Sequence, residues 1–195
     1  CLVGSEMCIR DRSKTVVFDL GGGSTEFVLG TEDGVQAARS VNIGCVRLTE
    51  RHMASAPATP DQIQRVEADT DAAIDTVLQS VPLEKATRAV AVAGTATTIA
   101  AAALGLKTYD SEAINGSSIS VDTVQKTAEM LRSMTREERA ALGYMHPGRV
   151  DVIGAGATIY ARIMTRLREI TEGNIDSVTV SEHDILDGIA LSQVR

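Results

Sequence analysis

The residues best suited to chemistry in this sequence form a glycine-rich turn with a carboxylate on either side. In chain order they are Asp19, Gly21, Gly22, Gly23, Ser24, Thr25 and Glu26. Because glycine has no Cβ, consecutive backbone N–H groups in such a turn can approach phosphate oxygens closely. The two hydroxyls would add donors, the aspartate could hold a hydrated divalent cation, and the glutamate could bind metal or orient a water. The pattern indicates a phosphate site, unless the glycines serve only the geometry of a hairpin whose acids face solvent.

The neighbouring sequence excludes two common phosphate-binding motifs. No Gly-Lys-Ser/Thr follows the glycines, so the turn is not a P-loop, and an expected strand follows it instead of the helix of a Rossmann fingerprint. A second candidate is the segment 93–98, where an expected strand passes into a helix. Helix N-terminal N–H groups and hydroxyls suit an anion, so Gly94 and Thr95 are predicted to bind phosphate. The alternative for this segment is a buried helix capped by threonine.

The elements that must position these residues follow from the hydrophobic pattern. Short β-branched or alternating apolar runs predict strands over residues 15–20, 25–29, 35–41, 89–93 and 178–180. Helical spacing predicts helices over residues 46–53, 60–80, 95–104, 121–134, 151–167 and 184–194. Residues 114–120 are expected as a short extended piece, and residues 107–148 as a helical insertion.

The order of these elements predicts the fold class. Apart from the insertion it is βββαβαβα, which is typical of an α/β domain with a mixed five-stranded sheet and helices on both faces. Capping boxes are expected at Thr59 with Gln62 and at Thr135 with Glu138.

Composition limits the classes of partner. The chain has 195 residues, and 19 Lys and Arg against 26 Asp and Glu give it a formal net charge of −7. This acidic balance and the shortage of aromatic side chains argue against nucleic acid as a partner. Three cysteines do not make a disulfide framework, so the cytoplasm is the expected compartment. The uncharged stretch 89–106 is interpreted as a buried strand and helix, not as a membrane span.

Six segments together resemble the exopolyphosphatase/guanosine pentaphosphate phosphatase family, within the superfamily of actin, sugar kinases and chaperone ATPases. They are VVFDLGGGSTEFVLG (Val16 to Gly30), NIGCVRLTE (Asn42 to Glu50), AVAGTATTIAA (Ala91 to Ala101), YDSEAINGSSIS (Tyr109 to Ser120), HPGRVDVIGAGATI (His146 to Ile159) and VTVSEHDILDGIAL (Val178 to Leu191). The first of them resembles the family's second phosphate motif. The resemblance implies a ribonuclease-H-like domain over residues 13–195, in which the turn 21–24, Asp19 and Glu26 contact phosphate and Mg²⁺.

Family members also carry an earlier domain of the same fold, with the first phosphate motif and the glutamate thought to activate the attacking water. That domain is absent from this sequence, and residues 1–12 are interpreted as a non-native tail. The resemblance therefore implies the second half of a cleft enzyme whose N-terminal domain is the missing partner.

The implied reaction is Mg²⁺-assisted release of terminal phosphate from polyphosphate or guanosine pentaphosphate. Two alternatives stay open: an ATPase or sugar-kinase-type domain of the same superfamily, and a non-catalytic phosphate-binding or dimerisation module. We expect the chain alone to be almost inactive, and its uncovered face to bind phosphate weakly or to pair with a second copy.

The remaining candidates are interpreted as structural. Histidines with no ligand spacing are expected at the surface or at caps: His52, His146 and His183. Arginines on helices could guide polyphosphate, although a solvated helix face is the simpler interpretation: Arg132, Arg136, Arg139, Arg162 and Arg166. Cys45 is expected to be a small buried residue, and Gly154 and Gly156 to permit close helix packing.

Overall fold

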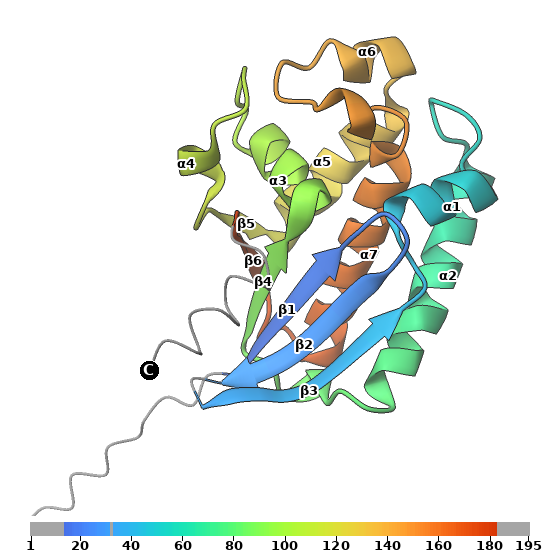
Figure 1. Ribbon diagram of the computed structural model, residues 1–195. Coiled ribbons are helices and arrows are strands. Elements are labelled where there is room, and N and C mark those ends of the chain that lie inside the picture. Colours follow the sequence, from blue (N-terminus) through green and yellow to red (C-terminus); the bar gives the residue numbers. More distant parts are fainter. Residues whose placement is uncertain (1–13, 32, 183–195) are drawn as a thin grey trace, which may run out of the picture.

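The chain is built around one mixed β-sheet, shown in Figure 1. The computed structural model describes residues 14–31 and 33–182. Within these residues the strands are β1 (Thr15–Leu20), β2 (Thr25–Thr31), β3 (Gly34–Val41), β4 (Arg88–Val92), β5 (Ser118–Ser120) and β6 (Ser177–Val180). Their order across the sheet is β3-β2-β1-β4-β6-β5. β1 pairs antiparallel with β2 and parallel with β4, and β4 pairs parallel with β6.

The α/β class and the mixed sheet are confirmed, but the expected number of strands is wrong. The sheet of the described residues has six strands, because residues 118–120 pair antiparallel with β6. The sequence indicated only an extended piece there, since three residues with one buried side chain, Ile119, are too few to establish a period of two.

The helices lie close to their predicted positions. They are α1 (Cys45–His52), α2 (Pro60–Leu78), α3 (Ala93–Ala103), α4 (Ser111–Ile114), α5 (Val121–Ser133), α6 (Arg136–Ala140) and α7 (Ile153–Ile170), with 3₁₀ turns η1 (Leu83–Lys85) and η2 (Pro147–Arg149). Both expected capping boxes are present. The helix expected over residues 184–194 lies outside the described residues. No helix that the structure describes has the length and apolar character needed to cross a membrane.

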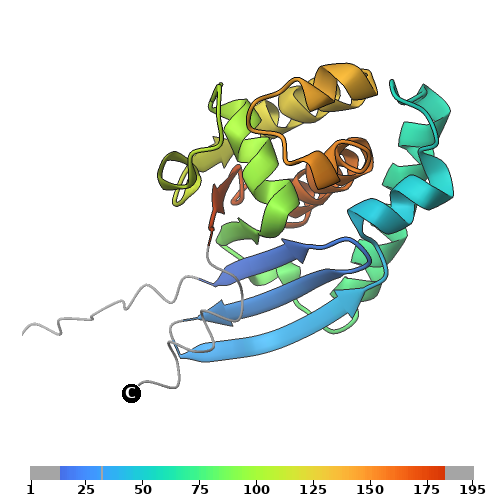
Figure 2. The same ribbon diagram turned by 45° about the horizontal axis from the view of Figure 1, so that its top comes forward.

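The hydrophobic core lies between the sheet and α7. Side chains of β1 alternate in burial, so that Val16, Phe18 and Leu20 point to one face and are at most 1% exposed. The ring of Tyr160 in α7 lies 5.2 Å from that of Phe18, measured between centroids. Figure 2 shows α7 lying over this face of the strands. The sequence also predicts a helix over residues 184–194, which lie outside the described residues. The prediction that helices cover both faces of the sheet therefore stays a prediction.

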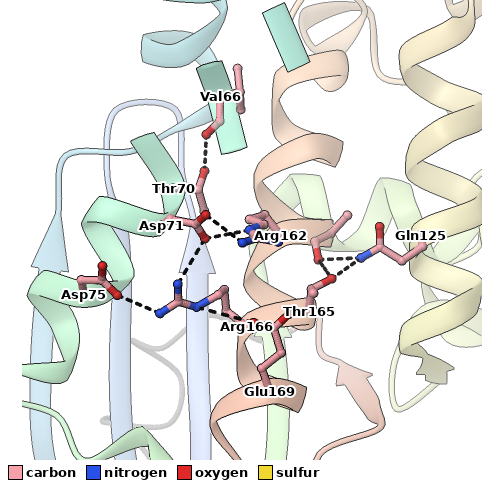
Figure 3. Close-up of polar contacts among 10 residues, drawn as sticks. Val66, Thr70, Asp71, Asp75, Gln125, Arg162, Thr165, Arg166 and Glu169 are labelled. Carbon is pink, nitrogen blue, oxygen red and sulfur yellow. Dashed lines mark hydrogen bonds and ion pairs between the residues drawn. The ribbon is translucent and has the colours of Figure 1, made fainter. Parts of the chain in front are cut away.

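Two arginines of α7 join it to α2 instead of forming the solvated face that the sequence suggested. Figure 3 shows both of them pointing to carboxylates of α2. Arg162 donates through Nε and Nη2 to the two oxygens of Asp71 at 2.7 and 2.8 Å. Arg166 donates through Nη2 to Asp75 at 2.7 Å. These guanidinium groups are therefore engaged in helix packing.

We expect Asp71→Ala to lower the free energy of unfolding by about 1 kcal/mol, because a bidentate and partly buried pair is worth more than an exposed one. The matched control is Arg65→Ala, which breaks an exposed pair with Asp61. It should change stability by less than about 0.5 kcal/mol. Urea unfolding measures both values, and equal losses would contradict the structural role of the α2–α7 pairs.

Candidate phosphate-binding site

The two glycine-containing segments predicted from the sequence meet at one edge of the sheet. The turn 21–24 follows β1, and the N-terminus of α3 follows β4, which is parallel to β1. From β1 the sheet continues to β2 on one side and to β4 on the other. In α/β sheets such a switch in strand order, at the carboxyl ends of parallel strands, is where ligands bind.

The glycine turn is held by the beginning of α1. Within the turn, the N–H of Gly21 donates to the carbonyl of Ser24 at 3.0 Å. The carbonyls of Gly21 and Gly22 accept hydrogen bonds of 2.9 to 3.1 Å from the first three N–H groups of α1. Arg47 adds a bond of 2.7 Å from Nε to the carbonyl of Gly23. A helix normally leaves its first N–H groups without partners, so the turn satisfies α1 while α1 fixes the turn.

This arrangement leaves particular N–H groups for a ligand. None of the hydrogen bonds within the described residues uses the N–H of Gly22 or Gly23. Gly23 is exposed and Gly22 is half-buried. Because their carbonyls are bonded to α1 and to Arg47, these amides are left as donors of the kind that bind phosphate oxygens in glycine turns.

Gly44, immediately before α1, is required by this contact. A Cβ at residue 44 would collide with the backbone of Gly22 and Gly23. The backbone of Gly44 is extended, with φ of −156°, so the need for glycine is one of space and not of conformation.

The two predicted carboxylates lie opposite each other on neighbouring strands. Asp19 of β1 is directly paired with Glu26 of β2, which places both side chains on the same, half-buried face of the sheet. Glu26 Oε1 accepts hydrogen bonds from Ser24 Oγ at 2.7 Å and from Ser40 Oγ at 2.6 Å. Ser40 was not found from the sequence, although it is the residue of β3 directly opposite Glu26.

Thr25 does not have the predicted role of a hydroxyl donor to phosphate. Its side chain is fully buried and donates to the carbonyl of Ile43 at 2.7 Å. The cause is strand alternation, because Thr25 shares the core face of β2 with Phe27 and Leu29. Thr25 therefore supports the loop that leads into α1.

At the second segment, the hydroxyls are turned inward. Thr95 is only 5% exposed, and its side chain hydrogen-bonds to the thiol of Cys45. Thr97 and Thr98 donate to the carbonyl of Gly94 at 3.3 and 2.8 Å. The Thr95 hydroxyl is therefore buried, and the alternative of a buried threonine-rich helix describes these side chains. The backbone at Gly94 remains at the sheet edge.

Arg149 is a candidate that the sequence did not reveal, although it lies in the segment HPGRVDVIGAGATI. Its Nη1 donates to Thr98 Oγ1 at 3.1 Å. Its guanidinium covers Gly94 so closely that a Cβ there would collide with it. Because Arg149 lies far from Gly94 in the sequence, only the fold places this positive charge beside the start of α3.

Ala93 gives a further sign that this edge is specialised. It begins α3 with φ of 71°, in the left-handed region that residues with a Cβ seldom occupy. Such strain is concentrated at functional sites, where the surrounding structure enforces it.

Cys45 connects the two halves of the site. Its N–H donates to the carbonyl of Gly21, and its thiol meets Thr95 at the start of α3. A Cβ at Gly156 of α7 would lie 3.0 Å from Thr95 Cγ2 and 3.2 Å from Cys45 Cβ. Burial raises the pKa of the Cys45 thiol. The expectations of a buried Cys45 and of close packing at Gly156 are confirmed.

The described histidines lie outside this site, as expected. His52 Nε2 lies 2.8 Å from a carboxylate oxygen of Asp69, and His146 caps η2 by accepting from the N–H of Gly148. His183 lies outside the described residues. The part of the chain that the structure describes contains no group of three or more His, Cys, Asp or Glu able to hold a metal.

The fold defines the chain as an α/β domain with a candidate phosphate site at this edge, and comparison with known proteins identifies its relatives. Residues 2–193 match the Ppx/GppA phosphatase family. Exopolyphosphatase 2 of Mycobacterium tuberculosis is 49% identical over 177 residues, which are 91% of this chain and 54% of that protein. The chain thus spans about half the length of this curated relative.

Solved structures agree with this assignment. The crystal structure of an exopolyphosphatase-like protein is 40% identical in sequence to this chain and superposes with a TM-score of 0.88. The match covers 97% of this chain and 62% of that protein's chain. The Ppx/GppA phosphatase of Aquifex aeolicus is 26% identical and superposes with a TM-score of 0.78. The match covers 96% of this chain and 59% of the Aquifex chain. The chain belongs to the Ppx/GppA phosphatase family, as the sequence resemblance implied.

The contact between Gly44 and the turn gives a testable result. We expect Gly44→Ala to lower the free energy of unfolding by about 2 kcal/mol, because the added methyl group collides with backbone that cannot rotate away. Gly23→Ala is the matched control, since its Cβ would meet nothing closer than Arg47 Nη2 at 3.8 Å. The control should cost less than about 1 kcal/mol. A Gly44→Ala protein as stable in urea as the control would show that α1 does not clamp the turn.

Proposed function

We propose that this chain is one wall of the catalytic cleft of a cytoplasmic phosphatase that releases terminal phosphate from polyphosphate or guanosine pentaphosphate. The observation that carries the proposal is the pairing of Asp19 with Glu26 across β1 and β2, beside the amides of Gly22 and Gly23. Carboxylates can bind a cation and N–H groups can bind phosphate oxygens, so together they suit a phosphate ligand that is bound with a cation. The second wall, in the N-terminal domain of the longer relatives, would supply the group that activates water.

The donors at this edge fit Mg²⁺. This ion usually keeps several waters and binds through one or two carboxylates together with substrate phosphates. Asp19 and Glu26 provide two carboxylates on one face, which agrees with such a partly hydrated ion. When bound, Mg²⁺ would neutralise charge on the phosphoryl oxygens.

The residues of the chain have separate tasks in this proposal. The amides of Gly22 and Gly23 bind and orient the terminal phosphate, and Ser24 and Ser40 fix the Glu26 carboxylate through short hydrogen bonds. The guanidinium of Arg149 places positive charge at the backbone of Gly94. Catalysis of this kind depends on positioning and on electrostatic stabilisation of the transferred group.

The sequence leaves two other functions open. An ATPase or sugar kinase of the same superfamily would bind ATP in preference to polyphosphate, which initial rates with both substrates separate. A non-catalytic phosphate-binding or dimerisation module would bind phosphate without turnover even when the N-terminal domain is present. Neither is favoured by a specific contact of this chain.

In the full-length protein, we expect Glu26→Gln to lower the rate of phosphate release by about 10²–10³-fold, the usual cost of losing one preorganised charge. Asp19→Asn should mainly raise the Mg²⁺ concentration needed for half-maximal rate. Asp33→Asn, in the exposed β2–β3 turn, is the control and should leave both quantities unchanged. Rates within about threefold of the parent for both site variants would sink the assignment of the two carboxylates.

The chain on its own tests the two-wall arrangement. Its described residues enclose one contiguous core, so we expect the chain to fold alone. It should nevertheless release phosphate from polyphosphate at under about one tenth of the full-length rate, because one wall cannot hold the attacking water in line. Circular dichroism verifies folding, and a phosphate-release assay with Mg²⁺ gives the rate. Activity comparable to that of the full-length protein would show that the second wall is dispensable.

A further inference from the structure

A cavity of about 460 Å³ lies at the end of α1 opposite the glycine turn. It is open to solvent on one side and is lined by the last turn of α1, the loop 54–56, α6 and Asp151. Its volume falls within the range of small-molecule sites. Met53, which is 6% exposed, contributes an apolar part of its lining.

A buried positive charge also lines this cavity. Arg139 of α6 is only 2% exposed, although the sequence suggested a solvated helix face for it. It donates through Nε to the carbonyl of Leu131 at 2.8 Å and through Nη2 to that of Arg132 at 3.4 Å. Burial lowers the pKa of Arg139, and Asp151 offsets only part of this effect.

The donors of Arg139 are not exhausted by these bonds. A guanidinium has five N–H groups, and the two carbonyls take only the side of the fork that includes Nε. Among residues 14–31 and 33–182, Arg139 forms no ion pair, because the nearby Asp151 is bound to Arg136 at 2.7 Å. No hydrogen bond within the described residues uses Nη1, so the N–H groups of this nitrogen are left for another acceptor.

The surrounding backbone does not cancel this charge. The carbonyls of Leu131 and Arg132 belong to the C-terminal end of α5, which partly offsets it. On its other side the guanidinium packs against the first turn of α7, where a Cβ at Gly154 would lie 2.8 Å from Nη2 and 3.2 Å from Nη1. The 18-residue helix α7 has no side-chain cap, so its positive N-terminal end adds to the charge of Arg139. The two carbonyls compensate part of the cost of burying this charge, and an anionic partner at Nη1 would compensate more of it.

The other lining residues restrict which anion fits. Glu50, Glu137 and Asp151 are exposed acids, and the only other arginine in the lining is Arg136. Three acids against two arginines repel a polyanion such as polyphosphate, but they favour a ligand that carries an amino group besides a single carboxylate. A carboxylate matches the planar fork of arginine, and an ammonium group matches the acids.

We propose that this cavity binds a small amino acid, with its carboxylate on Arg139 and its ammonium group at the acids Glu50 and Glu137. The site is separate from the phosphate-binding edge, and the proposal does not depend on the phosphatase activity.

Isothermal titration calorimetry of the 195-residue chain with each standard amino acid, at up to about 10 mM, tests the proposal. At least one of them should bind saturably and with one-to-one stoichiometry. The matching carboxylic acid without an amino group should bind at least about tenfold more weakly, and pyrophosphate should not compete.

Three variants decide whether binding occurs in this cavity. Arg139→Lys should weaken binding at least about tenfold, because lysine keeps the charge but loses the fork. Ala54→Phe should abolish binding by filling the cavity from the exposed loop, without contact to Arg139, and it remains informative if Arg139→Lys does not fold. Ala72→Phe, on the exposed side of α2 and outside the cavity lining, is the matched control and should bind like the parent.

The proposal is overturned if no amino acid binds at about 10 mM, or if binding is unchanged in Ala54→Phe. Binding of the simple carboxylic acid as tight as that of the amino acid would equally contradict it, since the acids at the mouth would then have no role.

Discussion

The hydrogen bonds between the carbonyls of the glycine turn and the first N–H groups of α1 hold the candidate site together. A turn that contains three consecutive glycines has many accessible conformations, and such freedom would weaken any ligand site made of backbone amides. Here the carbonyls of Gly21 and Gly22 are fixed by an element that needs acceptors at the same position. The amides on the other side of the same peptide groups are thereby directed outward. One set of contacts thus satisfies the helix, orders the turn and presents donors.

Small residues connect this contact between the glycine turn and α1 to the rest of the fold. Gly44 lets α1 approach the turn, and Gly156 lets α7 approach both Cys45 and Thr95. The beginnings of α1 and α3 and the first turns of α7 are therefore packed at one point, beneath the edge where β1 and β4 end. The acids of that edge lie on the opposite, half-buried face of β1 and β2, and Glu26 is oriented by Ser24 of the turn and Ser40 of β3. The packing and the polar groups of the site are separated by the sheet itself.

Much of this arrangement could be predicted from the sequence, because its strongest signals are local. Alternation of apolar residues located β1 and β2, and the capping boxes located the starts of α2 and α6. The same alternation predicts that Thr25 faces the core with Phe27, although the glycine-rich motif alone suggests a phosphate contact for Thr25. Ser40 and Arg149 could not be predicted, since one depends on strand register and the other on the packing of η2 against α3. The burial of Arg139 was hidden for a similar reason: a charged residue in a charged segment is normally solvated.

The position of Cys45 has a consequence for the motions of the site. Cys45 is only 9% exposed, and its Cβ packs beside Thr95 at the point where Gly156 of α7 approaches, so contact between α1, α3 and α7 restricts access to the sulfur. Its raised pKa further reduces the fraction of reactive thiolate. We expect chemical modification of this sulfur to be fast only when the three helices separate, so its rate would report how often they separate. Mass spectrometry of the Cys45 adduct over time would thus measure the opening of the edge that carries the candidate site.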